Sequence, residues 1–331
     1  MNGTRPAPGK VLLDAVDLTK TFGNGVKAVD AVSLRVRRGE TVGLVGESGC
    51  GKSTTAKMLL RLLAPDSGTI TFDGVDLLRA RGKQLRALRK RFQVVPQNPQ
   101  TSLNPRLTIR SSIEFNLRAH HVPRAEWGTR VAGLLDRVGL QAKHASSFPH
   151  EMSGGQLQRA AIARALATEP DLVVCDEAVS ALDKSVQAQV LNLLGELQRD
   201  LGVAYLFISH DLSVVEHVSD RIVVMYLGRV VEEGPSDRMW SQPSHPYTTT
   251  LLSASPGTGR ERIVLHGDPP NPAKPPTGCT FHTRCPVAVE RCSTQTPLLR
   301  VVGSGHTSAC HLVNESDPMA MPSAAVALAA N

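Results

Sequence analysis

The chain has 331 residues, 41% of them hydrophobic, and a formal net charge of +7. A chain of this length and composition buries one substantial core and a small appendage. No run approaches eighteen consecutive apolar residues, and residues 1–10 lack the apolar stretch of a signal peptide. We therefore expect a soluble, cytosolic protein that reaches membranes only through partners.

The first elements of the chain are β-strands. Residues 11–45 show short alternating strands with turn signals at residues 23–25 and 38–39, which predicts an antiparallel β piece. The last segment, residues 41–45, is typical of a buried strand. We expect residues 1–10 to be disordered.

A glycine-rich loop follows this buried strand. Residues 46–53 match the pattern G-x-x-x-x-G-K-[ST], and residues 54–63 after them have the composition of a helix. A loop between a strand and a helix lets successive backbone N–H groups surround a triphosphate. Lys52 would neutralise the β- and γ-phosphate oxygens, and the Ser53 hydroxyl would be a ligand to Mg²⁺. The residues expected to contact the nucleotide in this segment are Gly46, Glu47, Ser48, Gly49, Cys50, Gly51, Lys52, Ser53 and Thr54.

Much of the positive charge lies between residues 79 and 91, where seven basic residues occur without an acidic one. Leu85 and Leu88 have helical spacing there, and no aromatic residue intervenes before Phe92. We interpret this stretch as the solvated face of a helix, with a contact to lipid headgroups or to an acidic loop of a partner as the alternative. Nucleic-acid binding has little support.

The segment from residue 98 to residue 170 is helical in period, with an interruption at Gly139. Near its end, residues 152–156 supply a serine and two glycines at a predicted helix start. Exposed N–H groups and the helix dipole can bind an anion there, although an ordinary serine cap would have the same sequence.

Two apolar runs that follow end in polar residues. Residues 172–175 lead into Asp176 and Glu177, and residues 204–209 lead into His210. Buried parallel strands have this composition, and their carboxyl ends form the ligand-binding edge of a doubly wound sheet. Asp176 would hold Mg²⁺ through water, Glu177 would activate the attacking water, and His210 would donate to a γ-phosphate.

The C-terminal part of the chain changes in composition. Residues 223–231 predict a hairpin, and residues 267–276 contain five prolines. Four of the six cysteines lie within 32 residues, namely Cys279, Cys285, Cys292 and Cys310. Because a disulfide framework is not expected in a reducing cytosol, the four thiols suit a 4Fe–4S cluster or a Cys₄ zinc site, which their spacing does not distinguish. His282, His306 and His311 are alternative ligands, although we expect each to lie at the surface.

In this order, the motifs resemble those of the nucleotide-binding subunits of ATP-binding cassette (ABC) transporters. Residues 46–53 match that family's Walker A loop, Asp176 and Glu177 its Walker B pair, and residues 180–183 its D-loop. The remaining matches are Gln97 for the Q-loop, Ser153, Gly154, Gly155 and Gln156 for the signature, His210 for the switch histidine and Phe22 for the aromatic residue that stacks on adenine. The resemblance implies an α/β fold with an ABC-type P-loop NTPase core, an antiparallel β piece and a helical subdomain at about residues 98–170.

The family mechanism assigns roles to these positions. Two cassettes would pair head to tail, so that Ser153 and Gly155 of one close over the γ-phosphate bound at Lys52 of the other. Gln97 and Asp176 would hold Mg²⁺ together with Ser53. Glu177, His210 and Gln97 would serve hydrolysis, and Asp183 would contribute to the nucleotide site. Opening and closing of the pair would drive the membrane subunits.

Three residues depart from the family pattern. Met152 stands where leucine is usual, Ala178 where proline is usual and Cys50 where serine is frequent. None of the three changes removes a phosphate or metal contact, so we expect a hydrolytically competent site. Ala178 follows Glu177 directly, and we expect it to loosen the turn that orients this glutamate.

The C-terminal extension has a resemblance of its own. Residues 245–247, 267–270 and 279–286 resemble the extension of ATPases from oligopeptide, dipeptide and nickel importers. Members of that subfamily carry a 4Fe–4S cluster on the four matching cysteines, which implies the same here, with zinc or empty thiols as alternatives. Because the cysteines lie far in sequence from every nucleotide motif, we expect a structural role for such a cluster.

The resemblance as a whole implies an ATP-hydrolysing subunit that powers import of di- or oligopeptides. Its partners would be a second ABC ATPase subunit, two transmembrane permease subunits and, indirectly, an extracytoplasmic solute-binding protein. The permeases would hold it at the cytoplasmic face of the membrane through residues 98–103 and Glu151. The alternatives are an importer of nickel or another small solute, and a soluble ABC regulator.

The domain organisation expected from these observations has four parts. Residues 1–10 are a disordered N-terminus, residues 11–255 the nucleotide-binding domain, residues 256–313 a C-terminal domain with the four-cysteine site, and residues 314–331 a disordered tail.

Overall fold

The computed structural model describes residues 9–23, 25–255, 260–265 and 267–313. The chain divides into two units. The first unit holds Arg35–Thr41 and Ile70–Ile208 together with the residues before Ala15, and the second holds Ala15–Leu34, Val42–Thr69 and the residues from Ser209 onward. Disorder was expected at residues 1–10 and 314–331, of which residues 1–8 and 314–331 lie outside the described residues. Residues 9 and 10 are described and form backbone hydrogen bonds with Arg38. The predicted boundary at residue 256 stays a prediction.

A four-stranded sheet is built from strands near the start of the chain. Its order is β2 (Lys27–Arg37), β1 (Val11–Thr21), β4 (Ser67–Phe72) and β5 (Val75–Asp76). Strands β1 and β2 have eleven residues each, so the expected series of short strands is instead one pair of long ones. Strand β2 alternates between buried and exposed positions over much of its length, as expected for a sheet with one solvated face.

The first unit contains a parallel arrangement of three strands. They are β8 (Ala204–Ser209), of which Ser209 belongs to the second unit, β7 (Leu172–Asp176) and β6 (Phe92–Val95), in the order β8-β7-β6. Phe92 pairs with Leu172, and Leu172 pairs with Ala204, so the strands start level with one another. The carboxyl ends of β6 and β7 consequently reach the same edge. The predicted strands at residues 172–177 and 204–210 are confirmed.

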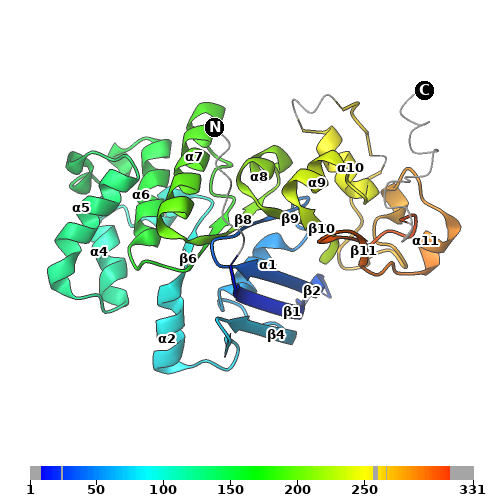
Figure 1. Ribbon diagram of the computed structural model, residues 1–331, viewed down its shortest axis with the longest axis horizontal. Coiled ribbons are helices and arrows are strands. Elements are labelled where there is room, and N and C mark those ends of the chain that lie inside the picture. The colour runs from blue at the N-terminus through cyan, green and yellow to red at the C-terminus, as the bar shows by residue number, and fades with distance from the viewer. Residues whose placement is uncertain (1–8, 24, 256–259, 266, 314–331) are drawn as a thin grey trace. The chain divides into compact units, whose positions relative to one another are not determined.

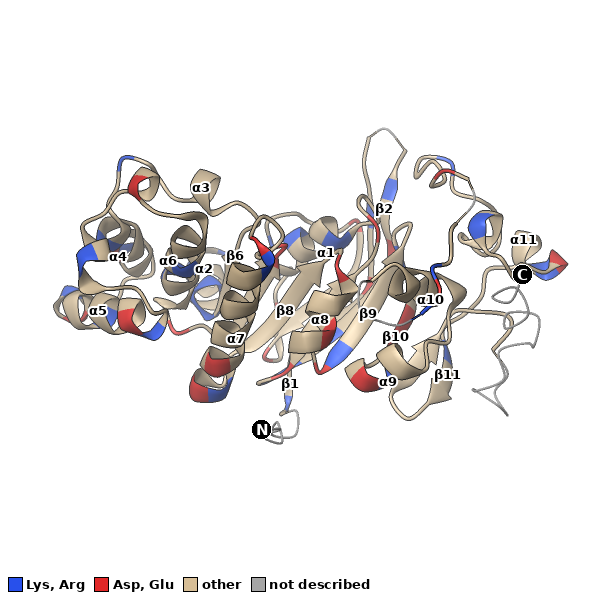
Figure 2. Cartoon of the chain, turned by 90° about the horizontal axis from the view of Figure 1, so that it is seen from above, with Lys and Arg blue, Asp and Glu red and all other residues tan. Residues whose placement is uncertain are grey.

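Six α-helices also belong to the described part of the first unit. They are α2 (Gly82–Arg91), α3 (Pro99–Ser102), α4 (Ile109–Ala119), α5 (Trp127–Arg137), α6 (Gly154–Leu166) and α7 (Lys184–Leu201). Helices α4, α5 and α6 lie side by side (Figure 1), which confirms the predicted helical segment. Helix α2 buries only Leu88, so the predicted basic helix is confirmed, and the choice between a solvated face and a contact to lipid or a partner stays a prediction. Basic and acidic segments are mixed along α4 and α5 (Figure 2).

The second unit contains the strands β11 (Arg300–Gly303), β12 (His306–Ser308), β10 (Arg229–Pro235), β9 (Arg221–Tyr226) and β3 (Thr41–Val45), in that order, and only Thr41 of β3 belongs to the first unit. Strands β3 and β9 are parallel, and β9, β10, β12 and β11 pair antiparallel. Leu227 and Gly228 join β9 to β10 with φ angles of 43° and 79°, the left-handed pair that a two-residue hairpin requires. The predicted hairpin at residues 223–231 is confirmed.

The helices of the second unit are α1 (Lys52–Leu59), α8 (Leu212–Val218), α9 (Ser236–Ser241), α10 (Pro246–Ser253) and α11 (Glu290–Thr294). Helix α1 ends four residues earlier than predicted, because Leu60 leaves the helical region and Arg61 has a φ of 54°. Among the described residues of both units, no helix is long and apolar enough to cross a membrane.

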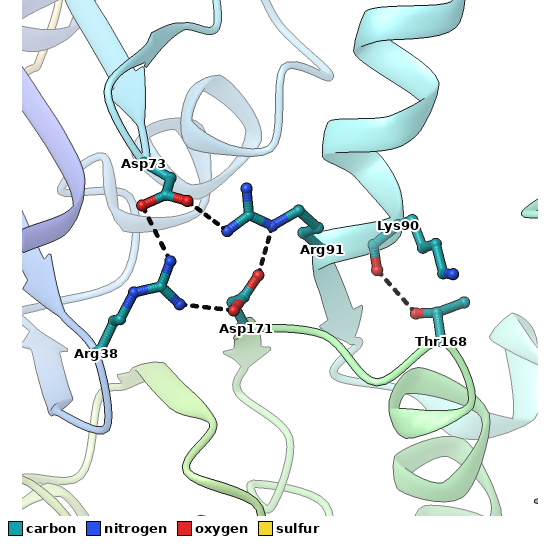
Figure 3. A network of polar contacts seen from close by, with 6 residues as sticks. All are labelled: Arg38, Asp73, Lys90, Arg91, Thr168 and Asp171. Atoms are coloured by element: carbon teal, nitrogen blue, oxygen red, sulfur yellow. Dashed lines mark hydrogen bonds and ion pairs between the residues drawn. The ribbon is translucent and has the colours of Figure 1, made fainter.

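A ring of four charged residues fixes the starts of β6 and β7 in the first unit (Figure 3). Arg91 precedes β6 and Asp171 precedes β7, and the Arg91 Nε donates to Asp171 over 2.6 Å. Asp73 accepts from the Arg91 Nη2 at 2.7 Å and lies 3.0 Å from the Arg38 Nη2. Arg38 closes the ring by donating to Asp171 over 2.7 Å. Two carboxylates that each bridge two guanidinium groups form a more ordered network than an isolated surface pair.

The pKa of Asp73 makes this ring testable. The hydrogen bond from Arg91, and then that from Arg38, lower this pKa below its ordinary value. A lowered folded-state pKa contributes stability above the unfolded pKa of about 3.9, and that stability is lost as the pH falls through the folded value. Asp73→Asn should lower the free energy of unfolding by about 1 kcal/mol at pH 7, a figure discounted because the side chain is partly exposed.

Urea unfolding of the wild type and of Asp73→Asn from pH 7 to pH 3 measures this difference. We expect it to be constant above about pH 5 and to shrink below about pH 4, as the pH falls toward the lowered folded-state pKa. Asp136→Asn, on an exposed position of α5, is the control that should change nothing. A difference that survives unchanged at pH 3 would contradict the assignment.

Candidate functional site

The glycine-rich loop at residues 46–53 connects β3 to α1 in the second unit. A Cβ atom on Gly46 would lie 2.2 Å from the Met225 carbonyl oxygen, and one on Gly51 would lie 2.2 Å from the Ala28 carbonyl oxygen. Both glycines also have positive φ angles, of 153° and 108°. The loop backbone therefore packs directly on neighbouring backbone, a position that a larger residue would not permit.

Lys52 is the first residue of α1 and is buried, with 5% of its surface exposed. Its ammonium group donates to the carbonyl oxygens of Gly46 at 2.6 Å and Glu47 at 3.0 Å. The lysine thereby closes the loop into a ring around its own charge. The first N–H groups of a helix have no intrahelical partner, so the start of α1 offers donors beside this cation.

Two residues without a predicted role contact the same loop. The Tyr247 hydroxyl accepts from the Glu47 N–H at 2.9 Å, and Arg284 donates to the Glu47 carboxylate at 2.9 and 3.2 Å. Both residues lie in segments that carried the resemblance of the C-terminal extension. Nothing in their local sequence indicates a contact to a loop 200 or more residues away.

In the first unit, Gln97 and Glu177 lie together at the edge reached by β6 and β7. The Gln97 Nε2 donates to the Glu177 Oε2 over 2.7 Å. Glu177 has a φ of 48°, a left-handed value that is unfavourable for a non-glycine residue and is concentrated at functional sites. Its N–H donates to the Ile208 carbonyl oxygen at 3.0 Å. Asp176, the last residue of β7, and Glu177 are half-buried.

The turn after Glu177 is ordered despite the alanine that follows. Ala178 is buried, and both the N–H and the hydroxyl of Ser180 donate to the Glu177 carbonyl oxygen, at 3.1 and 2.9 Å. We expected Ala178 to loosen this turn and so to affect the rate of ATP turnover, and that effect stays a prediction.

The start of α6 presents Ser153 and Gly154 at the surface of the first unit. Ser153 caps the helix and forms a reciprocal pair of hydrogen bonds with Gln156, with the Ser153 N–H donating to the amide oxygen at 3.0 Å. A Cβ atom on Gly155 would lie 2.6 Å from a Val186 methyl group, whereas Gly154 has room for one. The serine is therefore an N-cap in this state, as the more ordinary interpretation of the sequence expected.

Asp183 caps the next helix, α7. Its carboxylate accepts from the Val186 N–H at 2.9 Å and from the Ser185 hydroxyl at 2.8 Å. These hydrogen bonds, the first from Val186, lower the pKa of Asp183, so it is ionised at neutral pH.

His210 and Phe22 are exposed residues of the second unit. His210 follows β8 directly and precedes Asp211, the N-cap of α8. Phe22 has 41% of its surface exposed, and its N–H donates to the Val26 carbonyl oxygen in the turn between β1 and β2. Phe22 is therefore not a core residue.

The four C-terminal cysteines lie within electrostatic reach of one another. Burial raises the pKa of Cys279, that of Cys285 to about 12 and that of Cys310 to about 11. The neighbouring thiols raise these values further, and backbone N–H groups of residues 281, 282, 287 and 312 oppose them by donating to the sulfur atoms. The donor chemistry suits a soft metal, which alone would keep such buried thiols ionised.

The structure gives no support to a preformed metal centre. Within the part of the chain that it describes, no three histidine, cysteine, aspartate or glutamate side chains are arranged to hold a metal ion. All six cysteines are free thiols, and Cys292 and Cys310 are buried.

The neighbouring histidines have other partners. His282 contacts the Cys279 carbonyl oxygen and His311 the Gln295 carbonyl oxygen, each at 2.8 Å. The expectation that His306 lies at the surface is wrong, because it has 3% of its surface exposed and its Nε2 lies 2.7 Å from the fully buried Glu232 carboxylate. A buried carboxylate needs such a partner.

Two segments of the chain match known protein families. Residues 29–180 match the model of the ABC transporter family, and residues 231–292 match the model described as the oligopeptide/dipeptide transporter C-terminal region.

Several relatives align over most of the chain. The oligopeptide transport ATP-binding protein AppF of Bacillus subtilis is 51% identical over 295 residues, which are 87% of this chain and 90% of the relative. A probable peptide ABC transporter ATP-binding protein of Sinorhizobium fredii, y4tS, is 49% identical over 87% of this chain and 83% of its own length.

Solved structures resemble the chain over about two thirds of its length. The cbiO1 protein of Clostridium perfringens, part of an ABC transporter complex, has a TM-score of 0.65 and 29% identity over 70% of this chain and 92% of its own. The ATP-binding cassette MJ0796, in a dimeric post-hydrolysis state with ADP and Pi, has a TM-score of 0.61 and 29% identity over 68% of this chain and 99% of its own.

The fold and the phosphate loop define the chain as a P-loop ATPase of the cassette type. With 51% of the aligned residues identical to AppF over 90% of that relative, the chain belongs to the ABC transporter family as one of its ATP-hydrolysing subunits.

Proposed function

We propose that this chain is the ATP-hydrolysing subunit of an ABC importer of di- or oligopeptides. The observation that carries the proposal is the 51% identity to an oligopeptide transport ATP-binding protein, together with the oligopeptide/dipeptide transporter C-terminal region at residues 231–292. The same observation favours peptides over nickel or another small solute as cargo, and a transporter over a soluble regulator.

Nucleotide binding is proposed for the loop and its neighbours in the second unit. The backbone N–H groups of residues 48–54 would surround the phosphates, with Lys52 supplying the positive charge and Ser53 a hydroxyl ligand for Mg²⁺. Lys52 already lies inside the loop, and Ser48, Gly49 and Ser53 are exposed. Phe22 would stack on the adenine ring, and the exposed position of its side chain supports this role.

Hydrolysis is proposed for residues at the edge of β6 and β7 in the first unit. Glu177 would accept a proton from the attacking water, Asp176 would bind Mg²⁺, and Gln97 would orient Glu177 and bind the metal. The 2.7 Å hydrogen bond between Gln97 and Glu177 and the unfavourable φ of Glu177 support this assignment. His210 would donate to the γ-phosphate.

A second ABC ATPase subunit is proposed as the partner for hydrolysis. Ser153, Gly154, Gly155, Gln156 and Asp183 would bind nucleotide held by that subunit. Ser153 and Gly154 are exposed at the start of a helix, where N–H groups and the dipole favour an anion.

Membrane partners are proposed from the similarity to peptide-transport ATP-binding proteins. Two permease subunits, served by an extracytoplasmic solute-binding protein, would hold the chain at the cytoplasmic face of the membrane. Residues 98–103 and Glu151 would meet them. Residues 98–102 form α3 with its cap, and Gln97 and Asn98 at the start of this segment are exposed.

Two substitutions separate nucleotide binding from hydrolysis. Glu177→Gln should preserve the affinity for Mg·ATP and lower the turnover of the native complex by at least about 100-fold, because it removes the base and keeps the shape.

Lys52→Ala should weaken Mg·ATP binding by at least about tenfold, because it removes the charge inside the loop. Equilibrium titration and phosphate release measure the two effects.

Glu196→Gln, at an exposed position of α7, is the control for the first substitution. Unchanged turnover in Glu177→Gln would show that another group is the base. Unchanged affinity in Lys52→Ala would show that the loop is not the phosphate site.

We further propose that the four C-terminal cysteines hold a 4Fe–4S cluster, with zinc as the alternative. The proposal is supported by the electrostatic effect of neighbouring thiols on Cys279, Cys285 and Cys310 and by the backbone N–H groups that donate to the sulfur atoms of these three residues. Bound there, a cluster would cross-link four segments of the extension and would take no part in ATP chemistry.

Metal and sulfide analysis of the anaerobically purified chain tests this proposal. We expect about four iron and four sulfide per chain, with both lost in Cys285→Ser and retained in the control Cys50→Ser. About one zinc without sulfide would establish the alternative. Protein that contains neither metal would rule out both.

A further inference from the structure

Residues of the C-terminal extension form hydrogen bonds to Glu47 in the phosphate loop. The Glu47 N–H donates to the Tyr247 hydroxyl at 2.9 Å, and the Glu47 carboxylate accepts from the Arg284 Nη1 at 2.9 and 3.2 Å. Both the backbone and the side chain of the second loop residue are therefore held by residues from the last third of the chain. All of these residues belong to the second unit.

Because Arg284 is buried, its guanidinium group depends on the contact with Glu47. Only 9% of its side chain is exposed, and its Nη1 also lies 3.4 Å from the Tyr226 hydroxyl. Its Nε is buried without a hydrogen-bond partner among the described residues. A guanidinium group removed from water needs a counter-charge, and Glu47 supplies it. Loss of either partner leaves the other charge uncompensated.

An aromatic cluster makes the support behind Glu47 rigid. The ring centroids of Tyr226 and Tyr247 lie 4.7 Å apart, and that of Phe281 lies 5.2 and 5.3 Å from them. All three side chains are fully buried. Tyr226 ends β9, Tyr247 lies in α10, and Phe281 lies three residues before Arg284, so the cluster joins three segments at the base of the loop.

A cavity adjoins the start of the loop. It has a volume of 240 Å³ and is lined by residues 47–50 and 226–227 and by residues 269–272 of the extension. The extension therefore positions the loop through Glu47 and leaves open space beside Ser48, Gly49 and Cys50, the next residues toward the expected phosphate contacts.

We propose that Arg284 is a positioning residue for ATP binding, which acts through Glu47 and does not touch the nucleotide. The inference rests on the proposed role of residues 46–53 as the phosphate site. It makes the C-terminal extension a part of the nucleotide-binding machinery, in addition to any metal that it holds. Arg284 stands directly before Cys285, so the four-cysteine segment and the phosphate loop share this support.

Mg·ATP affinity of the full-length chain, measured by isothermal titration, tests the proposal. Arg284→Gln should weaken binding by about tenfold, because the released Glu47 carboxylate no longer holds the loop in shape. Arg284→Lys should recover part of the loss, since it restores the charge without the forked geometry. Arg300→Gln, on an exposed position of β11, is the matched control and should bind as the wild type does.

A double-mutant cycle separates positioning from general destabilisation. Glu47→Gln combined with Arg284→Gln should bind ATP no more weakly than Arg284→Gln alone, because the two residues act as one unit. Additive losses, or wild-type affinity in Arg284→Gln, would overturn the proposal. Circular dichroism confirms folding, and Glu47→Gln supplies the test if Arg284→Gln does not fold: wild-type affinity in Glu47→Gln would then also overturn it.

Lys52→Ala distinguishes a failure of the positioning role of Arg284 from a failure of the proposed phosphate site. If Lys52→Ala abolishes binding and Arg284→Gln leaves it unchanged, the positioning role alone fails. If Lys52→Ala itself binds ATP normally, the phosphate site is elsewhere and the proposed function of the loop fails with it.

Discussion

A loop that binds phosphate through its backbone has to be supported from behind, because its own side chains are too few to hold it. In this chain the support is direct contact between backbones. The Gly51 and Gly46 positions lie against the carbonyl groups of Ala28 and Met225, at distances that leave no room for a Cβ atom. The Lys52 ammonium then binds the first two carbonyl oxygens of the loop. Ser48, Gly49 and Ser53 remain exposed, on the side from which the proposed anion would approach.

The residues proposed for hydrolysis depend on a different constraint, the register of parallel strands. The ring of Arg38, Asp73, Arg91 and Asp171 fixes β6 and β7 where they begin, and the level pairing of the strands carries that alignment to their ends. Gln97 and Glu177 meet there over 2.7 Å. The unfavourable φ of Glu177 is tolerated because Ile208 and Ser180 hold its backbone. The ring of charged residues at one end of the strands thus helps to position the residues proposed for hydrolysis at the other end.

Sequence alone predicted the features that depend on neighbouring residues. The strands at residues 41–45, 172–177 and 204–210, the hairpin after residue 223 and the exposed helix α2 follow from periodicity and turn residues. The limits of the prediction are also physical. The exposure of Phe22 and the burial of His306 depend on packing, which a short segment does not encode. His306 is inside because it meets the Glu232 carboxylate, 74 residues away.

The contacts of Glu47 show the same limit at the candidate site. Tyr247 and Arg284 are separated from it by 200 and 237 residues. Glu47 was predicted only as a member of the loop, and the resemblance of the extension gave its residues no connection to nucleotide. Only the folded chain shows that the loop and the extension form a continuous support.

Amide hydrogen exchange of the full-length chain tests the central claim, that the loop is held in shape before nucleotide arrives. The account predicts slow exchange at the Glu47 and Cys50 amides without nucleotide, because they donate to the Tyr247 hydroxyl and the Glu47 carbonyl oxygen. Addition of Mg·ATP should then slow exchange at residues 48–53. Exchange of the nucleotide-free loop at the rate of an unfolded peptide would contradict the account.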